Sequence, residues 1–291
     1  YHELMRNERV PATKHVYMSL INAYVNCGQV EKAKKVLLDE GVPVKYINGI
    51  KSVLVSALAS YGQMSDALEL YEEIKQAGRS LDPKAIISLI EHVQSGDELD
   101  RLLRLLGELK DPNFWFDGCG RIAVYCVKHK FLSSAVDLLK QLKDKDELST
   151  DAVLNQVFCQ IFEAEPTAIE FGLDLLKAVK EELGLRPSRT ILDFLLSACV
   201  SAKDSHLAWL IWKEYQIANL PFNVLTYLRM YQVLLASGEH KAARVILKKI
   251  STNDPHVRVI IKACQEKFGN SVSVQTKKKQ SPPERNELNC P

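Results

Sequence analysis

The residues best able to do chemistry are scattered along this chain of 291 residues. Seven cysteines stand at positions 27, 119, 126, 159, 199, 264 and 290, and none of them forms a Cys-x-x-Cys pair. Because a zinc site needs closely spaced thiolate or imidazole ligands, this spacing favours cysteines that pack as small apolar side chains. The odd count indicates a reducing compartment rather than a disulfide framework. The seven histidines stand in separate local contexts and suggest no catalytic pair.

The common motifs of phosphate, nucleotide and metal chemistry are also absent from the sequence. It holds no Walker A loop, no glycine-rich dinucleotide fingerprint and no His-Glu-x-x-His. The acidic run "DKDE" (144–147) is more typical of a solvated loop between helices than of a metal site. We therefore expect no enzyme, no cofactor, no metal site and no small-molecule substrate.

Composition limits the remaining classes of function. The chain is 46% hydrophobic and 25% charged, which is ordinary for a soluble folded protein. With 38 basic and 36 acidic residues the net charge is +2, so any nucleic-acid surface must be local. No apolar run is long enough to cross a membrane, and we expect no membrane partner. The first residues, "YHELMRNERVPATKH", have neither an apolar signal region nor an Arg- and Ser-rich transit pattern.

A short pattern recurs along the sequence and indicates how the chain is organised. "GQVEKAKKVL" begins at Gly28 and "GQMSDALELY" begins 34 residues later at Gly62. A small or apolar residue follows each such turn, at intervals of 33 to 37 residues. Self-similarity at this period is the signature of a repeat architecture. The recurring residues are Ala33, Ala67, Leu102, Ala135, Gly172, Ala208 and Ala243.

Each unit reads as two amphipathic helices. "YMSLINAYV" (17–25) places Tyr17, Leu20, Ile21 and Tyr24 at helical spacing, and "VEKAKKVLL" (30–38) repeats the pattern. The recurrent short side chain lets the paired helices approach closely. Since one hairpin cannot bury its own apolar faces, neighbouring hairpins must stack. We predict an all-α fold, an α-solenoid of about seven helix-turn-helix repeats of 33–37 residues forming a right-handed superhelix.

Two repeat families have helical hairpins of this length. The tetratricopeptide pattern requires Gly or Ala in the middle of the first helix, where this chain has bulky residues such as Ile21, Val55 and Leu196. "VYMSLINAYVNCGQVEKA" (16–33) instead resembles the pentatricopeptide pattern V-x-Y-N-x-L-I-x-x-Y-x-x-x-G, and "ALELYEEIKQAGRSLD" (67–82) resembles its second helix and linker. The chain therefore resembles the pentatricopeptide repeat family over about residues 1–269.

The phase of the repeats predicts four segments. Residues 1–13 would be the end of a preceding repeat, residues 14–254 seven repeats, and residues 255–269 a terminal capping helix. Residues 270–291 would form a disordered basic and polar tail. We expect the chain to be a C-terminal segment of a longer protein, whose transit peptide this sequence lacks.

The resemblance implies binding of single-stranded or ribosomal RNA along the first helices, where basic side chains would meet phosphates. Acidic residues at Glu91, Asp117 and Asp193 intrude, so we expect this face to be only modestly positive. The basic candidates by repeat phase are Lys14, Lys51, Lys84, Arg121, Lys128, Arg189 and Arg229.

The family reads bases through a polar residue early in each first helix and a second polar residue in the linker. Only Ser52 with Asp82 resembles a readable pair here, of the guanine-selecting kind. Most other early positions cannot hydrogen-bond a base edge, so sequence-specific readout should be weak. Members that edit RNA carry a deaminase with His-x-Glu and Pro-Cys-x-x-Cys strings, and both strings are absent. The early positions are Met18, Ser52, Ile87, Gly120, Val157, Asp193 and Leu228.

Three functions fit these observations. The first, which the resemblance implies, is an organellar RNA-associated protein, mitochondrial or alternatively plastid, that acts in RNA processing, stability or translation within a ribonucleoprotein. The second is a protein-binding solenoid that docks a partner through "NFWF" (113–116). The third is a tetratricopeptide-like adaptor. "WLIWKEY" (209–215) suggests a stacking site, but Trp209, Trp212 and Tyr215 fall on a second helix and are expected in the core.

Overall fold

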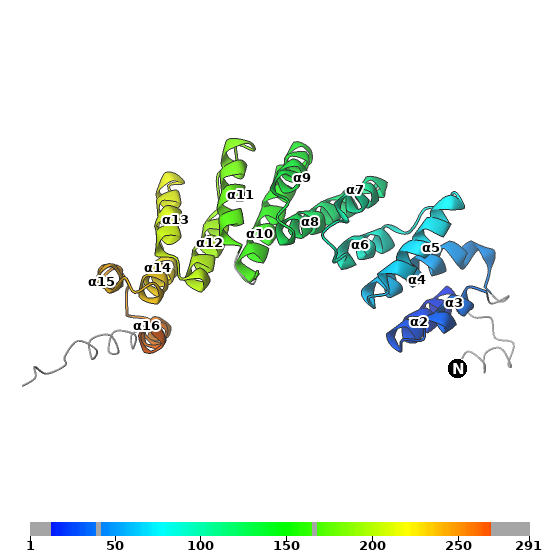
Figure 1. The fold of residues 1–291 in the computed structure, drawn as a ribbon, viewed down its shortest axis with the longest axis horizontal. Helices are drawn as coiled ribbons and strands as arrows, with labels where there is room; N and C mark the ends of the chain where they lie inside the picture. The colour runs from blue at the N-terminus through cyan, green and yellow to red at the C-terminus, as the bar shows by residue number, and fades with distance from the viewer. Residues whose placement is uncertain (1–12, 39–41, 165–167, 269–291) are drawn as a thin grey trace, which may run out of the picture. The chain divides into compact units, whose positions relative to one another are not determined.

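The computed structural model describes residues 13–38, 42–164 and 168–268, and these residues form an all-α fold (Figure 1). Within those ranges there are fifteen α-helices, one short 3₁₀ helix and no strand, which confirms the predicted fold class. None of the described helices is long and apolar enough to cross a membrane. The chain divides into two compact units, residues 1–153 and 154–291, with the boundary inside one helix.

In the first unit, consecutive helices form antiparallel hairpins. The first helix of each hairpin packs against its own second helix and against the first helix of the next hairpin. This stacking supplies the apolar contacts that a single hairpin lacks. The helices are α2 (Lys14–Asn26), α3 (Val30–Val36), η1 (Val44–Tyr46), α4 (Ile47–Ser60), α5 (Met64–Gln76), α6 (Pro83–His92), α7 (Leu99–Glu108), α8 (Pro112–Lys128) and α9 (Leu132–Lys145).

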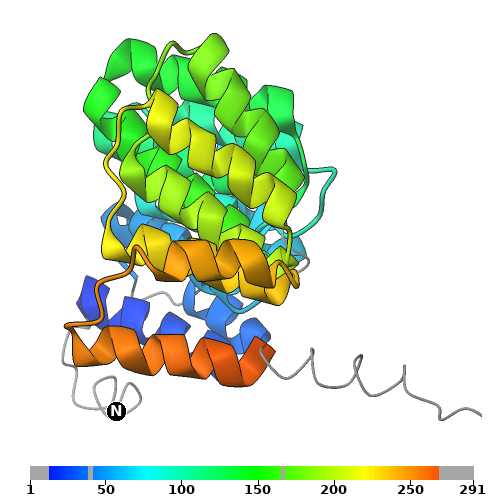
Figure 2. The same ribbon diagram turned by 90° about the vertical axis from the view of Figure 1, so that its left-hand side faces the viewer.

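The second unit continues the same arrangement. Figure 2 shows its last helix, drawn in orange-red, running beside the α14–α15 pair, and this helix packs against α14. The helix pairs from α2–α3 to α14–α15 fall within residues 14–254, the range predicted to hold the repeats. Of the predicted flanking segments, residues 1–12 and 269–291 lie outside the described residues. The helices are α10 (Glu147–Glu163), which spans the boundary, α11 (Ile169–Glu181), α12 (Arg189–Ala202), α13 (Ser205–Ile217), α14 (Val224–Ala236), α15 (His240–Leu247) and α16 (Pro255–Phe268).

The recurrent small residues lie where the helices approach most closely. Gly172 on α11 shows why: a Cβ atom added there would lie 2.8 Å from Cδ2 of Leu195 and 3.0 Å from Cγ2 of Ile161. A larger side chain would therefore separate the helices. The predicted burial is confirmed, because the alanines at these positions have no exposed surface, namely Ala33, Ala67, Ala135, Ala208 and Ala243.

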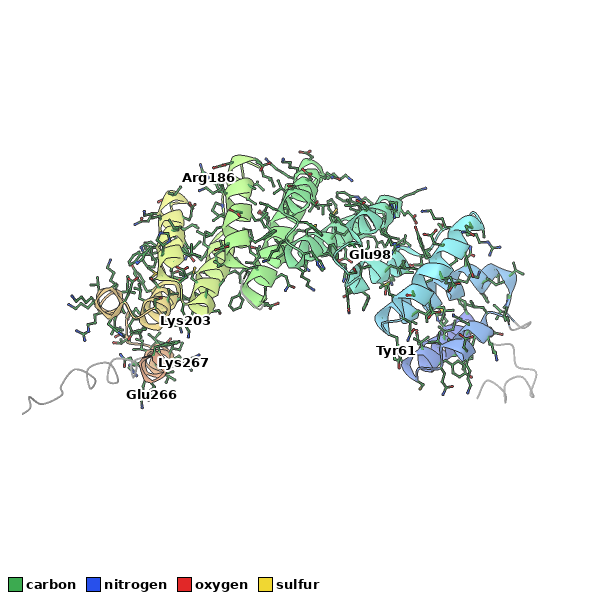
Figure 3. The ribbon with its side chains drawn as sticks, viewed as in Figure 1. Tyr61, Glu98, Arg186, Lys203, Glu266 and Lys267 are labelled. Atoms are coloured by element: carbon green, nitrogen blue, oxygen red, sulfur yellow. The ribbon has the colours of Figure 1, made fainter. Side chains whose placement is uncertain are left out.

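The repeated glycines have a backbone cause. Gly28 follows α2 with φ +70°, and Gly62 follows α4 with φ +85°. The N–H of Gly28 donates to Val25 O at 2.8 Å, and the N–H of Gln29 donates to Tyr24 O at 2.8 Å. This pair of bonds is the Schellman motif, which needs a left-handed residue after the helix. A lysine, Lys203, follows α12 at the position labelled in Figure 3, and it takes the same left-handed conformation with φ +56°.

The handedness of the superhelix stays a prediction.

Within each unit, ion pairs link second helices that lie one repeat apart. Lys34 on α3 pairs with Asp66 on α5 at 2.7 Å, and Lys180 on α11 pairs with Glu214 on α13 at 2.7 Å. These pairs lie near the surface, so each contributes about 0–1 kcal/mol to stability.

Candidate nucleic-acid interface

The first helices α2, α4 and α6 lie side by side in the first unit (Figure 1), and their residues line an open cavity of about 370 Å³. It is the place where the structure brings predicted site residues together. Lys14 and Met18 come from α2, Ser52 comes from α4, and Asp82 and Lys84 come from the start of α6.

Ser52 is held by two backbone groups. Its Oγ donates to Asn48 O at 3.0 Å and accepts from the N–H of Asp82 at 3.1 Å. The hydroxyl therefore joins the first helix of one repeat to the linker that begins the next. Because its hydrogen is committed to Asn48 O, Ser52 can offer the cavity only an acceptor lone pair. The side chain is 4% exposed, so access to that lone pair is narrow.

Asp82 has a local role in starting α6. Its Oδ1 accepts from the backbone N–H of Lys84 at 3.0 Å, and Pro83 occupies the first helical position. This is an N-cap followed by proline, an arrangement that sequences favour at helix starts. The Asp82 side chain is exposed, so a carboxylate oxygen remains available at the cavity.

Two ammonium groups make the cavity locally positive. Lys14 Nζ lies above Gly49 on α4, where an added Cβ atom would be 2.7 Å from it. Because Gly49 has no side chain, it leaves the space that Lys14 occupies. The sequence pattern did not predict a role for this glycine. Lys84 lines the same cavity from α6. Against these two positive charges the lining holds one carboxylate, that of Asp82, giving a local charge of 2 − 1 = +1.

The other basic candidates of the first unit lie outside this cavity. Lys51 is half-buried on α4, and Lys128 is exposed in the last turn of α8. Arg121 on α8 is paired within the protein. Its Nη1 lies 2.8 Å from Glu91 Oε2, and its Nε donates to Asp117 Oδ1 at 3.1 Å. Two acidic residues that were expected to weaken the face thus neutralise this arginine directly.

The arginines of the second unit are also engaged by protein groups. Arg229 Nη1 on α14 lies 3.0 Å from Asp193 Oδ1 on α12, and Asp193 also accepts from the hydroxyl of Tyr215. Arg189 donates to the backbone oxygen of Pro221, and its guanidinium lies 5.9 Å from the centre of the Tyr215 ring. Burial raises the pKa of Tyr215, so its hydroxyl remains a donor to Asp193. Arg229 is thus paired with a carboxylate, whereas the contacts of Arg189 include no carboxylate, and the Nη1 atoms of both arginines are buried without a hydrogen-bond partner.

The early first-helix positions offer few groups for base recognition. Ile87, Val157 and Leu228 are at most 7% exposed, and Gly120 has no side chain. Asp193 is already held in the ion pair with Arg229. Weak base readout by these positions stays a prediction.

The aromatic segments differ in exposure. Phe114, Trp115 and Phe116 are all half-buried, and Lys145 Nζ lies 3.3 Å from the centre of the Trp115 ring. That lysine covers the ring that was considered for docking a partner. Trp212 stacks on Phe222 with ring centres 3.9 Å apart. The predicted core position is confirmed for Trp212 and Tyr215, which are 7% and 0% exposed, whereas Trp209 is half-buried.

Reactive or metal-binding groups are not gathered anywhere in the described ranges. No three His, Cys, Asp or Glu residues there are placed to hold a metal ion. Burial raises the pKa of Cys119, Cys126 and Cys199 to about 12. Such thiols stay protonated near neutral pH and are poor nucleophiles.

Comparison with known proteins gives a consistent set of relatives. The protein family described as "PPR repeat" matches this chain at residues 15–39 and 52–79. The chain is 50% identical over 265 residues to "Pentatricopeptide repeat-containing protein At4g21880, mitochondrial" of Arabidopsis thaliana, covering 90% of this chain and 31% of that protein. It is 47% identical to "Pentatricopeptide repeat-containing protein At4g04790, mitochondrial" of the same plant, covering 96% and 34%. The chain thus spans about a third of the length of these relatives.

More distant similarities extend to a ribosomal protein and a crystal structure. The chain is 25% identical to "Small ribosomal subunit protein mS81 (rPPR8)" of Arabidopsis thaliana, covering 81% of this chain and 36% of that one. It aligns with the crystal structure of the pentatricopeptide repeat protein PPR10 from maize at a TM-score of 0.46 and 11% identity, covering 94% and 44% of the two chains.

Proposed function

Because the chain belongs to the pentatricopeptide repeat family, we propose that it binds single-stranded RNA in mitochondria, using the first-helix face of its first unit. The observation that carries the proposal is the cavity between α2, α4 and α6, where Lys14 and Lys84 flank the Ser52–Asp82 pair. In this proposal the segment binds RNA and catalyses no reaction.

The chemistry of the cavity fits one nucleotide. Ser52 and Asp82 present acceptor oxygens, because the serine hydrogen is committed to Asn48 O. Guanine presents N–H donors on the edge that such acceptors would contact. The ammonium groups of Lys14 and Lys84 would then meet the phosphates on either side. This arrangement favours guanine at one position and leaves other positions unread.

The RNA partner belongs to a ribonucleoprotein in this proposal. Support comes from the similarity to a protein named as a component of a small ribosomal subunit. The proposal is tested by sedimentation of tagged full-length protein from mitochondria. Co-migration with ribosomal RNA that is lost after ribonuclease treatment supports it. Migration as free protein, or recovery of the protein in plastids, contradicts it.

Direct binding is tested by salt titration of purified protein with a labelled single-stranded oligoribonucleotide. Each neutralised phosphate contributes a log–log slope of about −0.7. The double variant Lys14→Gln/Lys84→Gln should therefore bind more weakly, with a slope less negative by about 1.4. The matched control is Lys32→Gln/Lys110→Gln, which removes two exposed lysines that do not line the cavity.

The two variants distinguish binding at the cavity from non-specific attraction. The control should keep the parental affinity and slope, because only cavity lysines are placed to meet phosphates. Equal losses in both double variants would indicate general electrostatic attraction and would contradict the proposed site. Absence of binding by the parental protein at about 50 mM salt would contradict the proposed function itself.

A further inference from the structure

Two phenylalanines on neighbouring first helices of the second unit form an exposed aromatic pair. The ring centres of Phe162 on α10 and Phe194 on α12 are 6.3 Å apart, and their planes lie within 24° of parallel. Phe162 is 37% exposed and Phe194 is half-buried. One turn earlier on α10, Phe158 is completely buried. The core thus uses one phenyl ring of this helix and leaves the other at the surface.

The packing of α10 and α12 explains where the pair lies. The residues of α12 that enter the core include Ile191, Leu192 and Leu195, all at most 2% exposed, and Phe194 lies half-buried at the edge of this face. Asn155 on α10 accepts a hydrogen bond from Ser188 Oγ, the residue that caps α12, at 3.3 Å. This contact holds the two helices in register beside the rings.

The carboxylate next to the pair is already engaged within the protein. Asp193, next to Phe194, is bound by Arg229 and by the Tyr215 hydroxyl. Ser197 Oγ donates to the backbone oxygen of Asp193 at 2.8 Å. The site therefore offers a ligand an apolar aromatic surface beside a carboxylate that is already engaged. A flat aromatic ligand suits such a surface better than an ion.

The repeat phase places Phe194 on the same face of its repeat as the cavity of the first unit, and Phe162 meets this ring from the neighbouring first helix α10. In α4, Val53 follows Ser52 and lines that cavity. In α12, Phe194 follows Asp193, which occupies the matching early first-helix position. A phenyl ring thus stands on α12 where α4 has a cavity-lining valine.

We propose that Phe162 and Phe194 form a stacking platform for bases of single-stranded RNA. The inference rests on the proposed function and adds a second contact of different chemistry. Stacking on an aromatic face tolerates every base, because each base has a π face. The platform therefore contributes affinity without base selection, in a region where Arg229 is already paired with Asp193.

The test compares Phe162→Leu and Phe194→Leu with Leu210→Ala, an exposed apolar residue on the second helix α13. Leu210 is 39% exposed, close to the 37% of Phe162, so the control matches its exposure. Each phenylalanine variant should weaken RNA binding by about ten-fold, the typical loss for one stacked base. Because no phosphate contact is removed, the salt slope should equal that of the parental protein. Phe162→Trp should retain binding.

A spectroscopic measurement separates stacking from a structural role. In Phe162→Trp, titration with oligoribonucleotide should quench the fluorescence of the added tryptophan beyond any change in the parental protein. An oligomer of abasic ribose phosphates should not cause this quenching. Melting curves of the leucine variants establish that they remain folded.

The outcomes for the platform and for the proposed function are distinguishable. If the leucine variants bind like Leu210→Ala while Lys14→Gln/Lys84→Gln binds weakly, the platform is wrong and the proposed function stands. The platform is likewise wrong if Phe162→Trp shows no added quenching. If the parental protein binds no RNA, both are wrong.

Discussion

Ser52 and Asp82 illustrate how a residue pair can have a structural and a binding role together. Ser52 Oγ accepts the backbone N–H of Asp82, and the Asp82 carboxylate caps α6 through the N–H of Lys84. The linker is therefore set in place before any RNA arrives. Such preorganisation lowers the entropy cost of binding, because the recognising groups need not be ordered by the ligand.

Gly49 provides a residue-scale test of how Lys14 is positioned. In Gly49→Ala the new Cβ would lie within 2.8 Å of the Nζ and Cε atoms of Lys14, so the flexible end of the lysine must move. Alanine is a better helix former than glycine by about 1 kcal/mol. We expect an equal or higher melting temperature together with weaker RNA binding. Loss of stability, or unchanged affinity in a salt titration, would contradict this role of Gly49.

At the scale of helices, the sequence predicted those features that depend on residues close together in the chain. The spacing of Gly28 and Gly62 and the burial of Ala67 follow from helix ends and close packing, which leave a local pattern. The pairing of Arg229 with Asp193 joins helices 36 residues apart in sequence. Repeat phase alone therefore predicted that Arg229 is available to bind phosphate. In the structure the carboxylate of Asp193 on the neighbouring first helix balances its charge.

The same local patterns could not identify Gly49 or the Phe162–Phe194 pair. Gly49 matters because Lys14 comes from a different helix, and the rings meet only after α10 and α12 have packed. Contacts between repeats depend on side-chain direction, which spacing alone does not determine.

The close approach of paired helices predicts the effect of enlarging a small residue. Ala67 on α5 has no exposed surface, so Ala67→Leu would add three carbon atoms to a filled contact. Overpacking of this kind costs about 1–3 kcal/mol. We expect a lower free energy of unfolding in denaturant titration. Ala263→Leu, at an exposed position of α16, serves as a control and should be nearly neutral. An unchanged free energy for Ala67→Leu would show that the repeat contact is not close-packed.

At the scale of the whole molecule, charge is distributed so that little is left for general attraction of nucleic acid. The net charge is only +2, and the arginines on the first helices are engaged by carboxylates, a backbone oxygen or an aromatic ring. If RNA is bound through a few local contacts, the affinity should be modest and should depend weakly on the RNA sequence.

This distribution predicts the outcome of a panel of unrelated single strands measured at two salt concentrations. Affinities should be similar across sequences, because we predict that the Ser52–Asp82 pair is the one that reads a base edge. Replacing one guanine at a time should reveal a preference at no more than one position. Ser52→Asn should change the preferred base at that position and leave the salt slope unaltered, since no charge is changed. Several independent base preferences would contradict this conclusion, because they would require the buried early positions at Ile87, Val157 and Leu228 to reach the RNA.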